Sequence, residues 1–180
     1  METIVVTGSP GCGKSCSIYE LAQWMLKNGW QDDSNGLDDI CKVTNLSFEM
    51  ALQKEDRSHD IRQLFVDDGI RCLLWAPMDD NDCVKSLKRI INSIEMSGKK
   101  VNYLFTTLRR FDDSQYLLTL REMGWRESKE TLLDSEGHVI LQIPVLKVRH
   151  ELTEPKTNII RWYNSRIAKL LQTIFIQVVG

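Results

Sequence analysis

The sequence predicts an α/β fold in which a mostly parallel central sheet carries helices on both faces. Segments rich in β-branched and apolar residues alternate with segments whose apolar residues recur at helical spacing. A glycine-rich segment joins the first predicted strand to the first predicted helix, an arrangement typical of α/β proteins. We expect a single domain over residues 1–180, because this length suffices for one sizeable core and no linker-like segment interrupts it.

The first predicted unit covers the amino-terminal residues. Residues 3–7 (Thr-Ile-Val-Val-Thr) are uncharged and β-branched, as a buried parallel strand requires. Residues 14–28 have an apolar stripe at helical spacing, and Gly29 is a typical residue for the end of a helix. Residues 30–41 are polar and rich in turn formers, which predicts an exposed loop.

The remaining elements follow from the same two periodicities. Further core strands are expected at 70–76 and 101–107, and a β-hairpin near 131–146, although 139–145 also fits a core strand. The helix expected at 58–68 has Ser58 as its amino-terminal cap and Gly69 as its stop. The other expected helices are 46–55, 82–96 (capped by the cluster 79–82), 112–123 and 157–176. The inward residues expected on the last helix are Ile160, Tyr163, Ile167, Leu170 and Ile174.

Residues 8–15 (Gly-Ser-Pro-Gly-Cys-Gly-Lys-Ser) match the complete pattern G-x-x-x-x-G-K-[ST] between a predicted strand and a predicted helix. Glycines let backbone N–H groups converge on an anion, and a helix amino terminus adds partial positive charge. The motif therefore predicts a site for the phosphates of a nucleoside triphosphate. The residues expected to contact the nucleotide are Gly8, Ser9, Pro10, Gly11, Cys12, Gly13, Lys14, Ser15 and Cys16.

Within this motif, Lys14 is expected to reach the β and γ phosphates, and the Ser15 hydroxyl to ligate Mg²⁺. The acid that often accompanies such a site is less obvious, because neither core strand ends in Asp. Asp79 is the candidate metal-side carboxylate, and a helix cap is the alternative role for it. Thr106 or Thr107, at the end of the strand 101–107, are further candidates for a metal-bound water or the γ-phosphate.

Arg109 and Arg110 follow the strand 101–107, at the edge where open α/β sheets bind ligands. The planar guanidinium group suits phosphate oxygens, so both arginines join Lys14 as candidate catalytic residues. Two tryptophans near predicted loops, Trp30 and Trp125, are candidates for stacking on a nucleobase.

Composition excludes several classes of protein. The net charge of −2 gives no overall basic signal for nucleic acid, although residues 142–180 carry six bases and two acids. Five cysteines, an odd number without metal-site spacing or a preceding signal peptide, predict a reduced, cytoplasmic protein. The apolar run 170–179 is too short to span a membrane, so no membrane partner is expected.

On these residues, the chain resembles the P-loop kinases, in particular the phage-type deoxynucleoside monophosphate kinases. The resemblance rests on residues 4–15 and, more weakly, on 101–124. It implies a three-layer P-loop fold similar to that of the thymidylate kinases, with ATP and Mg²⁺ as cofactors. It also implies that Arg109 contacts a phosphate, whereas Thr107 stands where the family has a strand-end Asp.

The resemblance implies a kinase that moves the γ-phosphoryl group of ATP to a nucleotide or nucleoside. Two alternatives use the same motif: a kinase acting on a modified base in phage DNA, of the 5-hydroxymethyluracil type, and a DNA-packaging or motor-type ATPase. A GTP-binding switch fits less well, because the chain has no Asn-Lys-x-Asp motif. The sequence leaves the acceptor, the base of the donor and the oligomeric state open.

Overall fold

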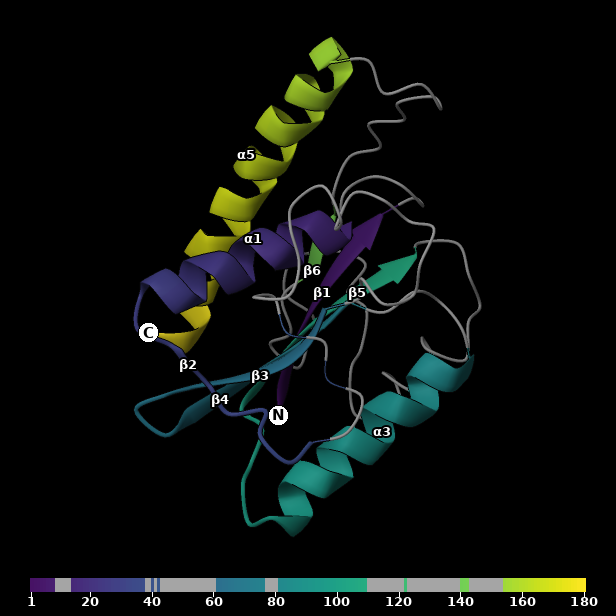
Figure 1. The fold of residues 1–180 in the computed structure, drawn as a ribbon, viewed down its shortest axis with the longest axis vertical. Helices are drawn as coiled ribbons and strands as arrows, with labels where there is room; N and C mark the ends of the chain where they lie inside the picture. The colour runs from purple at the N-terminus through teal and green to yellow at the C-terminus, as the bar shows by residue number, and fades with distance from the viewer. Residues whose placement is uncertain are drawn as a thin grey trace.

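The computed structural model describes residues 1–8, 14–37, 40, 42, 61–76, 81–109, 122, 140–142 and 154–180. These residues form an α/β structure with a six-stranded sheet in the order β2-β3-β4-β5-β1-β6 (Figure 1). The strands are β1 (Glu2–Gly8), β2 (Gln31–Asp32), β3 (Ile61–Asp67), β4 (Ile70–Ala76), β5 (Tyr103–Arg109) and β6 (Ile140–Gln142). The helices are α1 (Lys14–Lys27), α3 (Asn81–Met96) and α5 (Glu154–Val179).

The sheet is mixed. Strands β4, β5, β1 and β6 pair parallel with one another, whereas β3 pairs antiparallel with both of its neighbours, β2 and β4. The expectation of a mostly parallel sheet is therefore correct for the four strands around β1 and wrong for the β2–β3 side. All four parallel strands direct their carboxyl ends to one edge of the sheet, called here the carboxyl edge.

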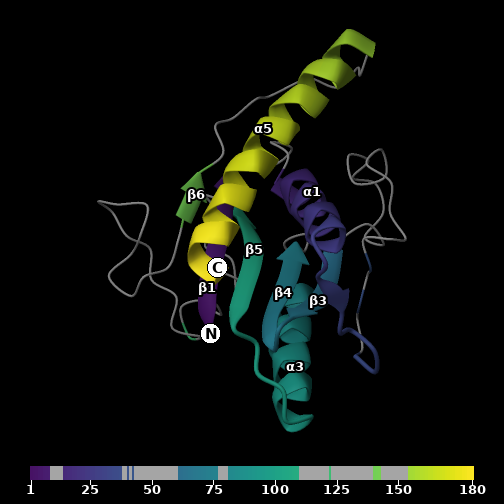
Figure 2. The same ribbon diagram turned by 90° about the vertical axis from the view of Figure 1, so that its left-hand side faces the viewer.

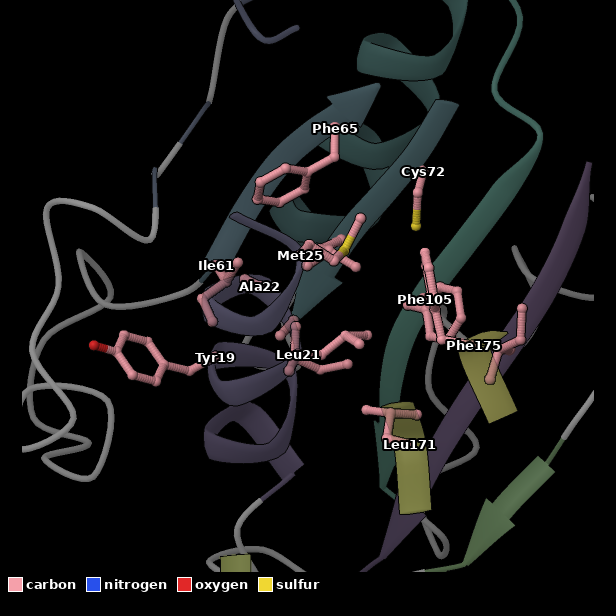
Figure 3. Packing of buried hydrophobic residues seen from close by; sticks show 14 of the residues in the cluster. Tyr19, Leu21, Ala22, Met25, Ile61, Phe65, Cys72, Phe105, Leu171 and Phe175 are labelled. Carbon is pink, nitrogen blue, oxygen red and sulfur yellow. The ribbon is translucent and has the colours of Figure 1, made fainter. Parts of the chain in front are cut away.

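Helices cover both faces of the sheet, as the sequence predicts (Figure 2). Helices α1 and α5 lie on the same face, where Leu171 and Phe175 of α5 join a core cluster with α1 and with Phe105 of β5 (Figure 3). Helix α3 lies on the other face and packs through its apolar stripe, which includes Leu87 and Ile94. Val5 and Val6, adjacent in β1, contribute to opposite clusters, which explains the uninterrupted apolar run of this strand.

The segment 61–69 forms a β-hairpin with β4 and not the end of a helix. Asp68 and Gly69 have φ values of 45° and 79°, and two successive positive values are typical of the two-residue turn that joins antiparallel strands. The apolar residues of β3 misled the helical prediction because Leu64 faces the α3 cluster while Phe65 faces the α1 cluster. A strand buried on both faces lacks the alternation that identifies strands in a sequence.

Two other expectations need correction. Residues 30–41 are not simply an exposed loop, because Trp30 is buried and the following residues form β2. In α5, Ile167 and Ile174 pack against the core as expected, but Leu170 is 45% exposed and its neighbour Leu171 is fully buried instead. Leu170 and Leu171 are both apolar and adjacent, so helical spacing alone does not show which of them faces the core.

Several predictions are confirmed or lie outside the described residues. Helix α1 ends as expected: Gly29 has a φ of 93°, and the N–H of Trp30 donates to the carbonyl of Met25, which together make a Schellman cap. Residues 140–142 form a strand that pairs parallel with β1, so this part of the expected hairpin region joins the central sheet. The helices expected at 46–55 and 112–123 lie outside the described residues, except for the helical residue Glu122.

Among the described residues, no helix has both the length and the apolar character that crossing a membrane requires.

Candidate phosphate-binding site

The two ends of the glycine-rich motif lie at the carboxyl edge of the sheet. Gly8 is the last residue of β1, and Lys14 is the first residue of α1. Figure 1 shows that α1 begins beside the arrowhead of β1. The strand β1 is an interior strand, flanked by β5 and β6. This is the strand-to-helix placement in which the motif can direct backbone N–H groups and a helix amino terminus at an anion.

Helix α1 holds its first turn in place by packing. Lys14 and Ser15 are partly buried, whereas Cys16, Ser17 and Ile18 are buried. One turn further on, Leu21 and other apolar side chains fix the helix against the sheet (Figure 3). The first turn therefore belongs to a helix anchored along its length, and the positions of Lys14 and Ser15 are set by that anchoring.

The structure brings one predicted arginine to the motif. Arg109 is the last residue of β5, and its Cα is the register partner of Gly8 in the adjacent strand. It therefore stands at the carboxyl edge, beside the first residue of the motif. The predicted site residues Ser9, Pro10, Gly11, Cys12, Gly13, Arg110 and Asp79 lie outside the described residues, as does Trp125.

Two expectations about this edge are corrected. Thr106 and Thr107 do not end their strand: both are buried, and β5 continues through two more residues to Arg109. Trp30 is not placed to stack on a nucleobase, because it is buried and its ring meets Phe175 edge to face, with 5.2 Å between the centroids. Trp30 is a core residue that joins the end of α1 to α5.

Residues that could ligate a metal do not cluster in the described part of the chain. No group of three or more His, Cys, Asp or Glu residues lies there in an arrangement that could hold a metal ion. Ser15, in the first turn of α1, is the predicted metal ligand that the structure describes. A single hydroxyl is compatible with Mg²⁺, which keeps several waters and binds through few protein groups beside substrate phosphates.

A cation–π pair that the sequence did not indicate, Arg62 with Trp75, lies at the same edge. Strand β3 runs antiparallel to β4, so Arg62 is paired with Trp75 near the carboxyl end of β4. The guanidinium carbon lies 6.0 Å from the centroid of the Trp75 ring. Arg62 Nε and Trp75 Nε1 are buried and have no hydrogen-bond partner in the described structure. The Asp68-Gly69 turn was the sequence signal that could have placed Arg62 here, because it identifies the hairpin.

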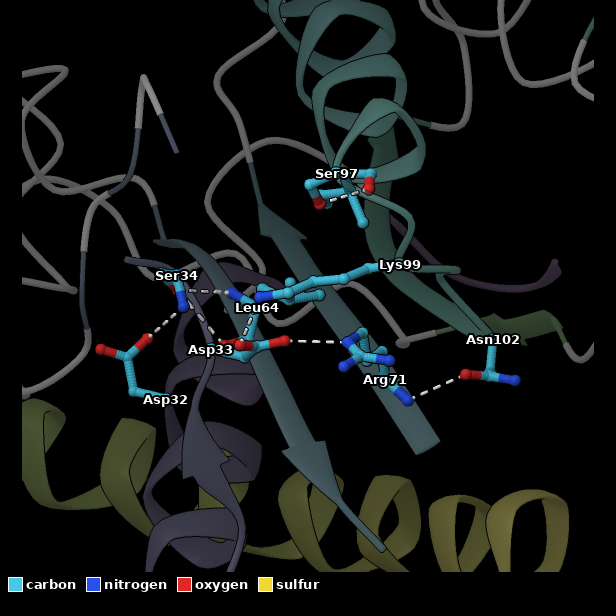
Figure 4. A network of polar contacts seen from close by, with 9 residues as sticks. Asp32, Asp33, Ser34, Leu64, Arg71, Ser97, Lys99 and Asn102 are labelled. Carbon is cyan, nitrogen blue, oxygen red and sulfur yellow. Dashed lines mark hydrogen bonds and ion pairs between the residues drawn. The ribbon is translucent and has the colours of Figure 1, made fainter. Parts of the chain in front are cut away.

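The opposite edge of the sheet carries a closed polar network (Figure 4). Asp33 accepts hydrogen bonds from Arg71 Nε at 2.8 Å and from Lys99 Nζ at 2.7 Å. Burial raises the pKa of the Asp33 carboxyl, but these two cations outweigh it and hold that pKa below its ordinary value. Asn102 completes the network by accepting from the backbone N–H of Arg71. This network joins the end of α3 to the amino-terminal parts of β4 and β5.

Ser34, which follows β2, continues the hydrogen bonding along β3 through its side chain. The Ser34 hydroxyl donates to the carbonyl of Leu64 and accepts from its N–H, at 3.2 and 3.0 Å. Asp32 accepts from the backbone N–H of Ser34 at 3.1 Å and forms an ion pair with Lys42. The Ser34 hydroxyl thus satisfies both backbone groups of Leu64, as the backbone of a neighbouring strand would. These hydrogen bonds have a structural role.

Comparisons of this chain with protein-family models, with curated proteins and with solved structures gave no match.

Proposed function

We propose that this chain is an ATP-dependent phosphotransferase with a three-layer P-loop fold. The observation that carries the proposal is the position of the motif G-x-x-x-x-G-K-S: its first glycine ends an interior parallel strand, and its lysine begins the next helix. This arrangement is the one in which the motif cradles phosphates. The reaction moves the γ-phosphoryl group of ATP to a nucleotide or nucleoside acceptor.

In this proposal each described residue has a separate role. Lys14 places its charge at the β and γ phosphates, and the Ser15 hydroxyl is the protein ligand for Mg²⁺. When bound, Mg²⁺ would neutralise charge on the phosphates. Arg109, beside Gly8, stabilises charge on the travelling phosphoryl group.

The residue that ends β5 favours transfer to an acceptor over motor-type hydrolysis. Motor-type ATPases place acidic residues at the end of a strand beside the motif, where they organise the metal and the attacking water. Here β5 ends in Leu108 and Arg109. A cation at that position suits a reaction that depends on positioning and charge neutralisation, as phosphoryl transfer does.

The test is to offer ATP labelled in the γ-phosphate, with Mg²⁺, to separate panels of nucleoside monophosphates, nucleosides and DNA. We expect the label to appear in a nucleotide or nucleoside product. Label appearing only in DNA would assign the acceptor to the alternative kinase. Release of inorganic phosphate that is stimulated by DNA, without a labelled acceptor, would contradict phosphotransfer and support the motor-type alternative.

A further inference from the structure

Helix α5 carries an exposed aromatic and basic stripe on the side away from the core. Trp162 is 61% exposed, and the guanidinium carbon of Arg166 lies 5.4 Å from the centroid of its ring. Lys169 and Thr173 are exposed and continue the stripe at helical spacing. The core residues of α5, including Leu171 and Phe175, occupy the opposite side. The four residues Trp162, Arg166, Lys169 and Thr173 are called here the α5 stripe.

The charged residues of α5 that follow its first residue are all basic. Glu154 is its first residue and its only acid, and the basic residues that follow are Lys156, Arg161, Arg166 and Lys169. A helix that is stabilised by surface ion pairs would carry acids among these bases. The excess of four bases over one acid gives the helix a positive field, although the whole chain has a net charge of −2.

The helix that carries the stripe projects beyond the carboxyl edge of the sheet. Figure 2 shows that the amino-terminal half of α5 extends past the carboxyl edge of the sheet. Trp162 and Arg166 belong to that half. The aromatic end of the stripe therefore lies on the half of α5 that projects in the direction to which β1 and β5 point their carboxyl ends.

We propose that the α5 stripe binds single-stranded nucleic acid. Unpaired bases stack on exposed aromatic rings, and the backbone phosphates require cations beside them; the stripe offers both within two turns of one helix. A duplex hides the faces of its bases, so a tryptophan favours the single strand. The binding does not depend on ATP, and it extends the proposed function by adding a macromolecular ligand.

The experiment uses the full chain without ATP and measures the fluorescence anisotropy of a labelled oligothymidylate over a range of salt concentrations. We expect binding that weakens as salt increases. Trp162→Ala should weaken it by about fivefold or more, because one base loses its stacking partner. Trp162→Phe should retain most of the affinity, since it keeps an aromatic face.

Charge is tested separately with two matched double variants. Arg166→Gln with Lys169→Gln should lower the slope of log affinity against log salt by about 1.4, the value for two phosphate contacts on a single strand. Arg89→Gln with Lys100→Gln removes the same charge from exposed residues at and after α3, and should leave the slope unchanged.

Three results would overturn the proposal: absence of oligothymidylate binding, equal losses in the two double variants, or binding to phosphatidylserine vesicles in place of the oligonucleotide. Lys14→Ala should bind the oligonucleotide as well as the unmodified chain does. If phosphoryl transfer is never detected but the oligonucleotide binds through Trp162, the proposed function fails and the nucleic-acid surface stands.

Discussion

Gly8 and Arg109 are register partners at the carboxyl ends of two adjacent parallel strands, so an arginine stands beside the first residue of the glycine-rich motif. If Arg109 meets charge that develops during transfer, Arg109→Ala should lower kcat by about 100-fold or more while the KM for ATP changes little. Steady-state kinetics at saturating acceptor measure both. Arg89→Ala, on the exposed side of α3, is the control and should behave like the unmodified chain. A change confined to KM would assign Arg109 to ground-state binding.

Lys14 begins α1 and is partly buried, and its predicted contribution is a charge at the phosphates. Lys14→Ala should abolish turnover, while the free energy of unfolding changes by less than about 0.5 kcal/mol. Lys27→Ala, at the exposed last turn of the same helix, should change neither quantity. Turnover that persists in a folded Lys14→Ala variant would rule out the phosphotransferase proposal.

The Asp33 carboxyl makes stability depend on pH. Its pKa in the folded chain lies below the ordinary value, because Lys99 and Arg71 outweigh the effect of burial. Its stabilisation is therefore fully present above the unfolded pKa of about 3.9 and is lost as the pH falls through the folded pKa. Asp33→Asn should cost about 1–3 kcal/mol at neutral pH and flatten the acid dependence of stability.

Urea unfolding measured at a series of pH values below about 5 checks this prediction. Lys99→Ala removes one of the two cations, so its profile should lie between those of the unmodified chain and Asp33→Asn. A profile for Asp33→Asn that is as steep as that of the unmodified chain would show that other carboxyls dominate the acid response.

Substitutions in the turn between β3 and β4 test whether residues 68 and 69 form a hairpin turn or the end of a helix. Asp68 and Gly69 both have positive φ, a conformation that costs about 1–2 kcal/mol for a residue with a Cβ and almost nothing for glycine. Gly69→Ala should therefore destabilise the chain, whereas Asp68→Gly should be neutral or slightly stabilising. In the last turn of a helix, Asp68→Gly would cost about 1 kcal/mol. Thermal unfolding of the two variants separates these cases.

Phe175 and Ile176 are adjacent in α5, and only Phe175 is buried, so alanine substitutions at the two positions test the packing of this helix. Phe175 is 2% exposed and its ring meets the rings of Trp24, Trp30 and Phe105. Phe175→Ala should cost about 3–5 kcal/mol. Ile176 is 55% exposed, so Ile176→Ala should cost less than about 1 kcal/mol. Denaturant unfolding measures both, and equal losses would contradict the packing of α5 on this face.

The sequence predicts best where one local signal decides the structure. The glycines after α1 and α3 mark both helix ends, and the chain forms a Schellman cap at each, with the N–H of Lys99 donating to Ile94 at the end of α3. The β-branched run of β1 is also recognisable, because it is too uniform for an amphipathic helix. For these elements the cap or the periodicity alone determines the outcome.

For a strand that is buried on both faces, the local sequence pattern does not predict the structure correctly. Leu64 and Phe65 each enter a different core cluster, so β3 has the spacing of a helix in the sequence. Because the sequence predicts a helix at these residues, it gives no sign that Arg62 lies at the carboxyl edge. Arg62 is placed there by the antiparallel pairing of β3 with β4, in which it lies opposite Trp75. The register of Gly8 with Arg109 likewise depends on strand order, which no local pattern encodes.

The division of the core between two faces has a consequence for the order of folding during synthesis. The described members of the α3-face cluster all lie between Val5 and Leu104, whereas the α1-face cluster also requires Leu171 and Phe175. A ribosome releases the chain from its amino end, so the first face can close while the second still waits for α5. We expect the nascent chain to expose the part of the α1-face cluster that Leu171 and Phe175 cover, until the last helix emerges.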